Sequence, residues 1–199
     1  MKTFKEQYFD NNNQKANIES MLNGYEEIIS KHKPNKRAFV LARTIKMLPL
    51  VAIWLLFDII GITILATSGI FEGEPILILF LGVFFVIHLI PVWIWLGKLI
   101  QAMKQVKLEE YVLTSERVFV KSGDQEVNIR PIKYTEIISV SVDRSYTDKM
   151  LGVGDIHLIT TYQEAILHDL PDYEEVATAI HQHSVVEYEK QRSEEYSEE

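Results

Sequence analysis

Two ionisable side chains stand alone inside long apolar runs of the sequence. Asp58 is the single ionisable residue of the run 47–66, and His88 is the single one of the run 75–96. A charged carboxylate is costly in apolar surroundings, so it is usually paired or directed at protein. If the runs form antiparallel helices, a rise of about 1.5 Å per residue puts the two side chains within ~4–5 Å of each other in depth. We therefore expect them to meet, either as a structural polar clamp or as a proton-sensitive or partner-binding site.

The remaining histidines and glycines do not form a recognisable chemical centre. His181 and His183 are two residues apart, whereas helical metal-ligand pairs are spaced four apart. His157 and His168 fall on separate predicted strands, with no recognisable carboxylate or hydroxyl partner. The segment 152–154 (Gly-Val-Gly) lacks the lysine and helix context of a phosphate-binding loop, so its glycines predict a turn or bulge. The sequence has no cysteine, which excludes thiolate sites. We expect no cofactor, no metal and no enzyme.

The apolar runs themselves predict two membrane-spanning helices, over 47–67 and 75–97. About 20 apolar residues are needed to cross a bilayer core, and both segments are long enough. The linker 67–74 is too short to hold a domain, and its Gly and Ser residues suit a turn. The helices are therefore expected to form an antiparallel hairpin. Pro49 and Pro91 can kink their helices because each removes a backbone hydrogen bond.

Charged residues beside the two helices predict their orientation. The linker carries Glu72 and Glu74 and no base, whereas bases precede the first helix and follow the second. By the positive-inside rule, both termini are cytoplasmic, in a two-helix protein of the cell membrane. Residues 1–14 lack the apolar run of a signal peptide, so the first helix is expected to direct insertion. A basic cluster before that helix is read as a topology signal and an anionic-lipid anchor. It consists of Lys31, Lys33, Lys36, Arg37, Arg43 and Lys46.

Beyond residue 108 the pattern changes to short alternating runs, which are typical of β-strands. Pro171 and Asp172 then open a helix that reaches residue 182 or beyond, since proline and acids suit a helix N-terminus. The tail 187–199 is predicted to be a frayed helix extension or disordered. The fold class is thus a membrane α-helical hairpin plus an α+β domain, an antiparallel sheet or partly open barrel capped by a C-terminal helix. Strands are predicted over 110–114, 117–121, 126–130, 137–142, 155–161 and 165–170, with a turn at Gly123-Asp124 and a glycine-bearing loop over 149–154.

Four stretches after the hairpin carry a family resemblance: YVLTSERVFV, TEIISVSVDRS, LGVGDIHLIT and LPDYEEVATAI. The most specific parts are Y-x-L-T-x-x-R over 111–117 and L-G-x-G over 151–154. With the preceding hairpin, the chain resembles the bacterial PH-like domain membrane proteins over residues 24–185. The resemblance implies a PH-like domain over 108–185, held at the inner face of the membrane, and no enzyme. Some members of the family are linked to protection against membrane-active antimicrobial peptides.

The segment before the hairpin, residues 1–46, is open to two interpretations. In the proteins that this chain resembles, the part equivalent to 25–32 tends to be a strand of the PH-like sheet. We therefore predict a short helix over 17–23 and a strand over 26–31, which makes the hairpin an insertion within one domain. The alternative is a single amphipathic helix lying on the bilayer.

Charge limits the partners that the chain can have. Its net charge is −8, and acids outnumber bases in both 108–170 and 171–199. Such a domain is repelled by anionic surfaces, so neither specific phosphoinositide binding nor nucleic-acid binding is expected. The expected partners are membrane lipids and a protein partner or a second copy. The functional hypothesis is a non-enzymatic, membrane-anchored adaptor or assembly module. The alternative is an envelope-protection or immunity protein in which Asp58 and His88 do the work.

Overall fold

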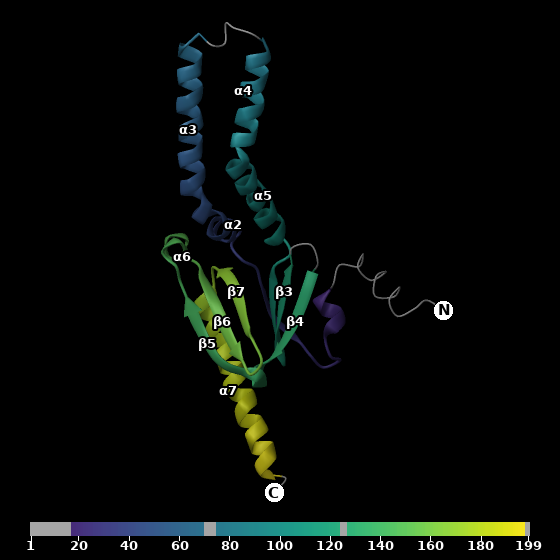
Figure 1. Ribbon diagram of the computed structural model, residues 1–199. Coiled ribbons are helices and arrows are strands. Elements are labelled where there is room, and N and C mark those ends of the chain that lie inside the picture. Colours follow the sequence, from purple (N-terminus) through teal and green to yellow (C-terminus); the bar gives the residue numbers. More distant parts are fainter. Residues whose placement is uncertain (1–16, 70–74, 124–126, 198–199) are drawn as a thin grey trace, which may run out of the picture. The chain divides into compact units, whose positions relative to one another are not determined.

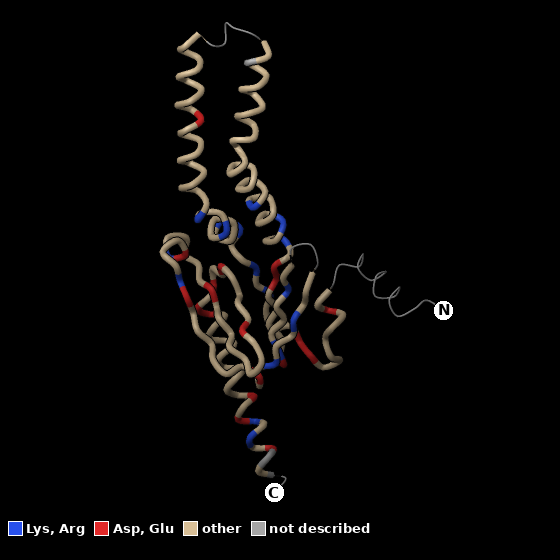
Figure 2. Tube along the Cα trace, viewed as in Figure 1, with Lys and Arg blue, Asp and Glu red and all other residues tan. Residues whose placement is uncertain are grey.

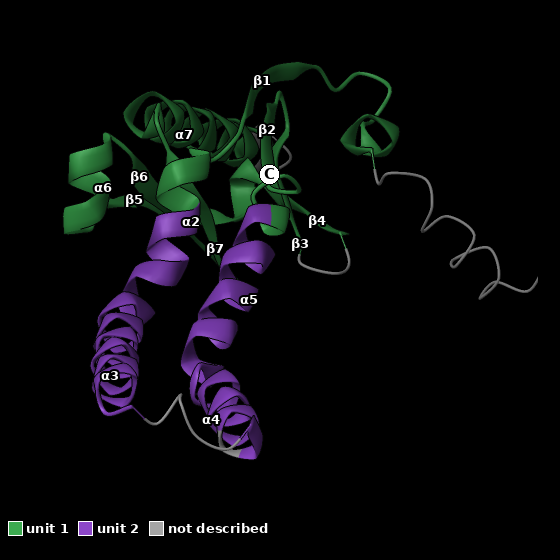
Figure 3. Cartoon of the chain, turned by 90° about the horizontal axis from the view of Figure 1, so that it is seen from above, with its two compact units in different colours: residues 1–39, 104–199 green, residues 40–103 purple. Residues whose placement is uncertain are grey.

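The chain divides into two compact units (Figure 3). The computed structural model describes residues 17–69, 75–123 and 127–197. One unit, called here the helical unit, is Val40–Met103. The other, the sheet unit, is discontinuous in sequence and combines Met1–Phe39 with Lys104–Glu199.

The first sheet of the sheet unit has four antiparallel strands in the order β1-β2-β3-β4. Figure 1 labels β3 and β4, and Figure 3 labels all four. Lys31 of β1 lies opposite Val112 of β2, so residues from before and after the helical unit are neighbours in one sheet. Successive side chains of a strand point to opposite faces. Tyr111 and Leu113 accordingly join the main core, while Val112 packs with Phe119 and Ile18 in a second, smaller cluster. The strands are β1 (Ile28–His32), β2 (Glu110–Thr114), β3 (Arg117–Gly123) and β4 (Val127–Lys133).

The second sheet has three antiparallel strands in the order β5-β6-β7, which makes β5 an edge strand. The short helix α6 (Tyr146–Leu151) connects the first two of them. It begins with a capping box, in which Ser145 and Asp148 each bond the other's backbone N–H. The strands are β5 (Ile137–Asp143), β6 (Gly154–Thr160) and β7 (Glu164–Leu170), with a single 3-10 turn, η5 (Tyr134–Glu136), before β5.

Helix α7 (Tyr173–Ser197) completes the core of the sheet unit. Its residues Val176, Ala177 and Ile180 are buried against side chains of both sheets. Such burial removes apolar area from water at about 25 cal/mol per Å² and is the main force that holds the helix in place. The predicted α+β arrangement, antiparallel strands followed by a C-terminal helix, is confirmed.

The helical unit consists of helical segments joined with short breaks. They are the end of α2 (Lys36–Thr44), the 3-10 turn η3 (Ile45–Met47), α3 (Leu48–Thr67), α4 (Pro75–His88) and the greater part of α5 (Ile90–Gln105). Pro49 lies in the first turn of α3, directly after the 3-10 turn η3 that separates this helix from α2. The predicted helix over 75–97 is interrupted at Leu89 and bent by 45°, in agreement with the kink expected from Pro91.

One helical stretch, Lys36–Thr67, is long and apolar enough to cross a membrane by its length and composition. Its most apolar part has a mean hydropathy of 2.4, and 11% of that part is buried. The bent pair Ile78–His88 and Ile90–Gln105 qualifies only when it is taken as one span. Figure 2 shows α3 and α4 almost free of charge, with basic residues on α2 and α5.

Two local predictions need correction. The predicted helix over 17–23 is a single 3-10 turn, η2 (Ile18–Met21), capped by Asn17. The predicted loop over 149–154 instead begins inside α6, because the capping box at Ser145 starts a helix there. Of the two alternatives for 187–199, a helix extension or disorder, the structure has the helix extension, as far as Ser197. Predictions for residues 1–14, for the linker acids Glu72 and Glu74 and for the turn at Asp124 lie outside the described residues.

Candidate functional site

The polar pair of the helical unit joins α3 to the end of α4. Nδ1 of His88 lies 2.6 Å from Oδ1 of Asp58, and Asp58 is only 4% exposed. Three aromatic rings surround the imidazole: Trp54 and Phe84 stack on it at 5.1 and 5.5 Å, and Phe57 is tilted at 5.6 Å. The predicted meeting of the two side chains therefore occurs in the structure. Whether the pair is a clamp or a functional site stays a proposal.

The bend after His88 explains one further contact of this pair. Pro91 has no N–H, so the helical bond to the carbonyl of residue 87 is lost and the chain bends. The N–H of Val92 donates to Leu89 at 2.9 Å, and the indole N–H of Trp54 donates to the carbonyl of His88 at 2.7 Å. A side chain of α3 thus satisfies a carbonyl at the break.

One polar atom of the pair is left over. Oδ2 of Asp58 is buried and has no hydrogen-bond partner among the described residues. Beside the pair lies an apolar cavity of about 200 Å³ lined by Ile53, Trp54, Phe57 and His88. A buried, unsatisfied carboxylate oxygen costs free energy. The pair is therefore the best place in the helical unit to look for a function.

The residues of the predicted basic cluster are divided between the two units. Lys31 is on β1 and binds Glu19 through Nζ–Oε1 at 2.9 Å. That hydrogen bond raises the pKa of Lys31 and lowers the pKa of Glu19. Lys33 also belongs to the sheet unit, while Arg43 and Lys46 belong to the helical unit. The role of these residues in lipid anchoring stays a prediction.

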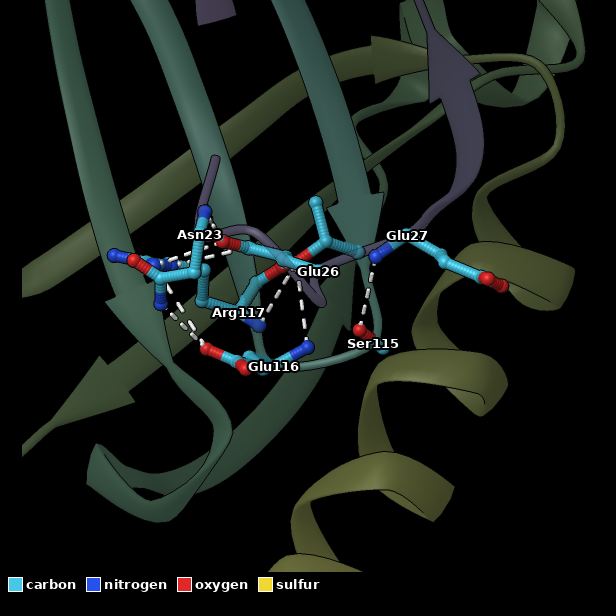
Figure 4. A network of polar contacts seen from close by, with 7 residues as sticks. Asn23, Glu26, Glu27, Ser115, Glu116 and Arg117 are labelled. Carbon is cyan, nitrogen blue, oxygen red and sulfur yellow. Dashed lines mark hydrogen bonds and ion pairs between the residues drawn. The ribbon is translucent and has the colours of Figure 1, made fainter. Parts of the chain in front are cut away.

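The Y-x-L-T-x-x-R motif forms a polar network at the turn between β2 and β3 (Figure 4). The guanidinium of Arg117 donates twice to Glu26, at 3.0 Å to Oε1 and 2.8 Å to Oε2. The hydroxyl of Thr114 is 2.6 Å from Oε1 of Glu26, and it accepts the N–H of Arg117 at 3.1 Å. The N–H of Asn23 donates to Oε2 of Glu26 at 3.0 Å, and its amide donates to Glu116 at 2.9 Å. The network joins the segment before β1 to this turn.

Glu26 is the residue of this network that sequence reasoning missed. It lies 91 residues from Arg117, and no local pattern marks it. Its side chain is fully buried, 0% exposed, and that of Arg117 is 16% exposed. Burial works to raise the pKa of Glu26, but hydrogen bonds from Arg117, Thr114 and the N–H of Asn23 hold that pKa below its ordinary value. The arginine of the motif is therefore a structural partner of a buried carboxylate.

The L-G-x-G motif has a structural explanation too. Gly152 ends α6 in the left-handed conformation, with φ of +67°, which glycine adopts without strain. Gly154 packs against the ring of Tyr173, and a Cβ at position 154 would lie 2.8 Å from Cγ of that ring. Each glycine thus has a structural role, one in the left-handed end of a helix and one in close packing against a ring.

Strand β1 carries an arrangement that resembles a catalytic triad. Nε2 of His32 lies 2.7 Å from Oγ of Ser30, and Nδ1 lies 2.5 Å from Oδ2 of Asp172. The order serine, histidine, aspartate is that of nucleophile, base and orienting acid in serine hydrolases. Sequence reasoning missed it because Asp172 is 140 residues from His32.

Hydrolysis also requires oxyanion donors and a cleft for the substrate. Neither Ser30 nor His32 lines the cavities of about 570, 280 and 200 Å³ in the described residues. What the contacts do accomplish is to tie β1 to the start of α7, because Asp172 directly precedes Tyr173. We therefore interpret the contacts among Ser30, His32 and Asp172 as a structural link between β1 and α7.

Two other histidines have carboxylate partners, which corrects the expectation that they have none. Nδ1 of His157 is 2.6 Å from Glu164, and Nδ1 of His168 is 3.4 Å from Asp155. Asp155 also accepts the N–H of Asp169, a non-glycine residue with φ of +52°, at 2.6 Å. Burial works to raise the pKa of Asp155, but His168 and this N–H hold that pKa below its ordinary value. Among the described residues no group of three or more His, Asp or Glu could hold a metal ion.

Described residues of the sheet unit line a larger and a smaller surface hollow. The larger, of about 570 Å³, lies between β5 and the C-terminal half of α7. The smaller, of about 280 Å³, is lined by residues of β3, β4 and β7 and by Glu109. The larger hollow is therefore the candidate binding site on the sheet unit.

Sequence comparison identifies the family. A sequence profile described as "Bacterial PH domain" matches residues 47–184. The chain belongs to this family. The bacterial PH domain profile begins beside the first residue of α3 and ends within α7, so it covers the apolar helices as well as most of the sheet unit. The predicted PH-like fold is thereby confirmed, and the family is generally non-catalytic. No curated protein matches the sequence.

Two solved structures are similar to part of this bacterial PH domain protein. A DUF1696 family protein with a pleckstrin-homology domain from Shewanella loihica PV-4 is 18% identical, and the match covers 40% of this chain and 74% of that chain with a TM-score of 0.34. A pleckstrin homology domain from Shewanella amazonensis SB2B is 19% identical, with 38% and 66% covered and a TM-score of 0.32.

Proposed function

We propose that this protein is a non-enzymatic binding module, anchored in the cell membrane by its helical unit and working at the inner face through its sheet unit. The observation that carries the proposal is the apolar surface of α3 and α4. Ile53, Phe57 and Phe80 are 65%, 64% and 67% exposed, among many similar side chains. An apolar surface of this extent is unfavourable in water and suits the interior of a bilayer.

Chain topology supports the orientation. The helical unit leaves the sheet unit after β1 and returns before β2, and these two strands pair. Residues that pair in one sheet lie on the same side of a bilayer. The helices therefore cross twice, as α3 and as the bent pair α4 and α5. The excess of bases over acids around the hairpin favours the cytoplasm for that side.

Single cysteines test the topology sharply because the chain has none of its own. Ser68→Cys, at the end of α3, is expected to react with a membrane-impermeant maleimide in intact cells. Ser193→Cys, on α7, is expected to react only after permeabilisation. Release of the chain by alkaline carbonate, or labelling of Ser193→Cys in intact cells, would contradict the proposal.

The binding role has its own test. The full chain, extracted in mild detergent and examined by native mass spectrometry, is expected at the mass of a stoichiometric complex with a protein partner or a second copy. The helical unit without the sheet unit is the control. A full chain recovered only at the mass of one copy would count against an adaptor.

The Asp58–His88 pair favours a second function, protection of the envelope against membrane-active peptides. The two side chains are hydrogen-bonded to each other inside an apolar helical unit, and one carboxylate oxygen is unsatisfied. Asp58 and His88 would be the residues that carry the protective role. Asp58→Asn is then expected to raise the sensitivity of cells to such peptides while Ser193→Ala does not. A strain that lacks the gene and is as sensitive as the parent strain would rule out the protective function.

A further inference from the structure

The groove of about 570 Å³ on the sheet unit has one wall of strand and one wall of helix. Ile137, Ile138 and Val140 belong to the β5 wall, and Val185, Tyr188 and Arg192 belong to the α7 wall. Both walls are parts of one compact unit. An occupant of this groove therefore contacts a sheet edge and a helix at the same time.

Strand β5 leaves backbone groups unused along this groove. Among the described residues it pairs with β6 alone. An edge strand presents a row of unpaired N–H and C=O groups to one side. Natural proteins often block such an edge with lysine or proline, and the β5 sequence Ile-Ile-Ser-Val-Ser-Val-Asp contains neither. The occupant that satisfies these groups is an extended backbone.

The groove also exposes apolar side chains from both walls. The register of β5 on β6 shifts between Ile137 and Ser139, which leaves Ile138 outside the ladder and 69% exposed. On α7, Val185 is 42% and Tyr188 is 62% exposed. Alternate side chains of an added strand point to one face. Apolar residues at every second position of the added strand would cover Ile138, Val185 and Tyr188.

The charges around the groove indicate which charge its occupant carries. The lining groups Arg192 and His181 are opposed by Glu189. Over residues 187–197, α7 carries four glutamates against Lys190 and Arg192, so this end of the helix is net acidic. The whole chain carries a net charge of −8. A segment with basic flanks is attracted by this field, whereas a second copy of the chain is repelled.

We infer that the β5–α7 groove binds an extended, net-basic segment of a partner protein, apolar at alternate positions, as an added strand along β5. The inference rests on the proposed binding function and supplies its site. Backbone bonds to β5 give affinity, and the apolar side chains between β5 and α7 give specificity.

A random library of peptides about ten residues long, a usual upper length for a strand, displayed on phage, tests the inference with the full chain in nanodiscs of zwitterionic lipid. Enriched peptides are expected to alternate apolar and polar residues, to gain Lys and Arg, and to exclude proline from the ladder positions. Empty nanodiscs are the control. No enrichment over empty nanodiscs, or enriched peptides that tolerate proline throughout, would overturn the inference.

Two matched pairs of variants locate the site. Val185→Arg places a like charge in the groove and is expected to weaken the enriched peptides by about tenfold or more. Val186→Arg, on the same helix and 59% exposed but outside the groove, is expected to leave binding unchanged. The second pair is Ile138→Arg, in the groove, and its control Ile159→Arg, on β6 and outside the groove. The native side chains are 69% and 45% exposed. Equal loss in both members of a pair would contradict the site.

The outcomes separate this inference from the proposed function. If native complexes of the full chain persist in Val185→Arg, the adaptor role stands and the groove is the wrong site. If no complexes form in either protein, the adaptor role itself fails. If Val185→Arg changes only self-association, the occupant is a second copy, and the inferred basic partner is wrong.

Discussion

Arg117 and Glu26 illustrate how much a single pair of residues contributes. Both charges are largely shielded from water. The guanidinium of Arg117 donates to Glu26, and the carboxylate of Glu26 also accepts from Thr114 and from the N–H of Asn23. Removing one partner of such a pair leaves the other charge buried and unpaired. Glu26→Ala is therefore expected to lower the free energy of unfolding of the sheet unit by about 3–5 kcal/mol.

Pulse proteolysis in urea measures this change. The three tryptophans lie at positions 54, 93 and 95, all in the helical unit, so their fluorescence does not report on the sheet unit. Glu27→Ala, the exposed neighbour on the same segment, is the control and is expected to change little. Equal midpoints for the two variants would contradict a stabilising role of the buried pair.

Through Asp155, the free energy of unfolding of the sheet unit depends on pH. Because its pKa in the folded protein lies below the ordinary value, its contribution is fully present above the unfolded-state pKa of about 3.9. The contribution disappears as the pH falls through the lower folded-state value. Asp155→Asn is thus expected to be destabilised at neutral pH and to converge with the parent protein once the pH has fallen below the folded-state pKa of Asp155. Unfolding curves from pH 7 down to 2 check this, with Asp143→Asn as control, and a constant difference would sink the idea.

Ser30 offers a direct test of the triad-like arrangement. Since Ser30 lines none of the three cavities described above, a fluorophosphonate probe is expected to leave it unmodified, as intact-protein mass spectrometry would show. His32→Ala is expected to destabilise the sheet unit by about 1 kcal/mol, the value of a typical hydrogen bond. Labelling of Ser30 that His32→Ala abolishes would instead make this protein a hydrolase.

The close contact between β6 and the start of α7 yields a prediction about elements. Gly154→Ala places a methyl group 2.8 Å from the ring of Tyr173, so strand or helix must shift. We expect a loss of about 1–3 kcal/mol, the usual cost of overpacking. Gly24→Ala has nothing within 4 Å and is the control. The midpoint of thermal unfolding, followed by far-UV circular dichroism, distinguishes them, and a Gly154→Ala variant as stable as the control would contradict this packing.

Sequence patterns predicted those elements whose signal is local. Alternation located the strands, and length and hydropathy located the apolar helices. Helix α6 was missed although Ser145 and Asp148 have the spacing of a capping box, which is a readable signal. The break at Leu89 could be anticipated from Pro91, but its position relative to His88 depends on bonds from the neighbouring helix.

Contacts between distant residues were beyond the sequence. Glu26 with Arg117 and His32 with Asp172 bring together residues 91 and 140 positions apart. Neither the residue types nor their neighbours mark these pairs, since Glu and His occur on ordinary surfaces as well. Asp58 and His88 were predictable because an ionisable group is conspicuous in an apolar run.

At the level of the whole molecule, the sheet unit is expected to fold without the helical unit. Replacing residues 40–103 by a flexible Gly/Ser linker of about 20 residues keeps every strand. This shortened chain is expected to be soluble and monomeric, with the amide protons of β1 and β2 protected from hydrogen exchange. A chain beginning at residue 104 lacks β1 and Glu26 and is expected to be less stable. Equal stability of the two would show that the first segment is dispensable.

The pairing of β1 with β2 also fixes an order of events during synthesis. β1 leaves the ribosome about 80 residues before β2, which at 5–20 residues per second is about 4–16 s. Throughout that interval β1 has no neighbour, while the apolar helices emerge and are available for insertion. The sheet closes only afterwards. If the helices are anchored in the membrane as proposed, a delay in insertion would leave β1 and the apolar helices exposed together, and slow insertion would then favour aggregation over folding.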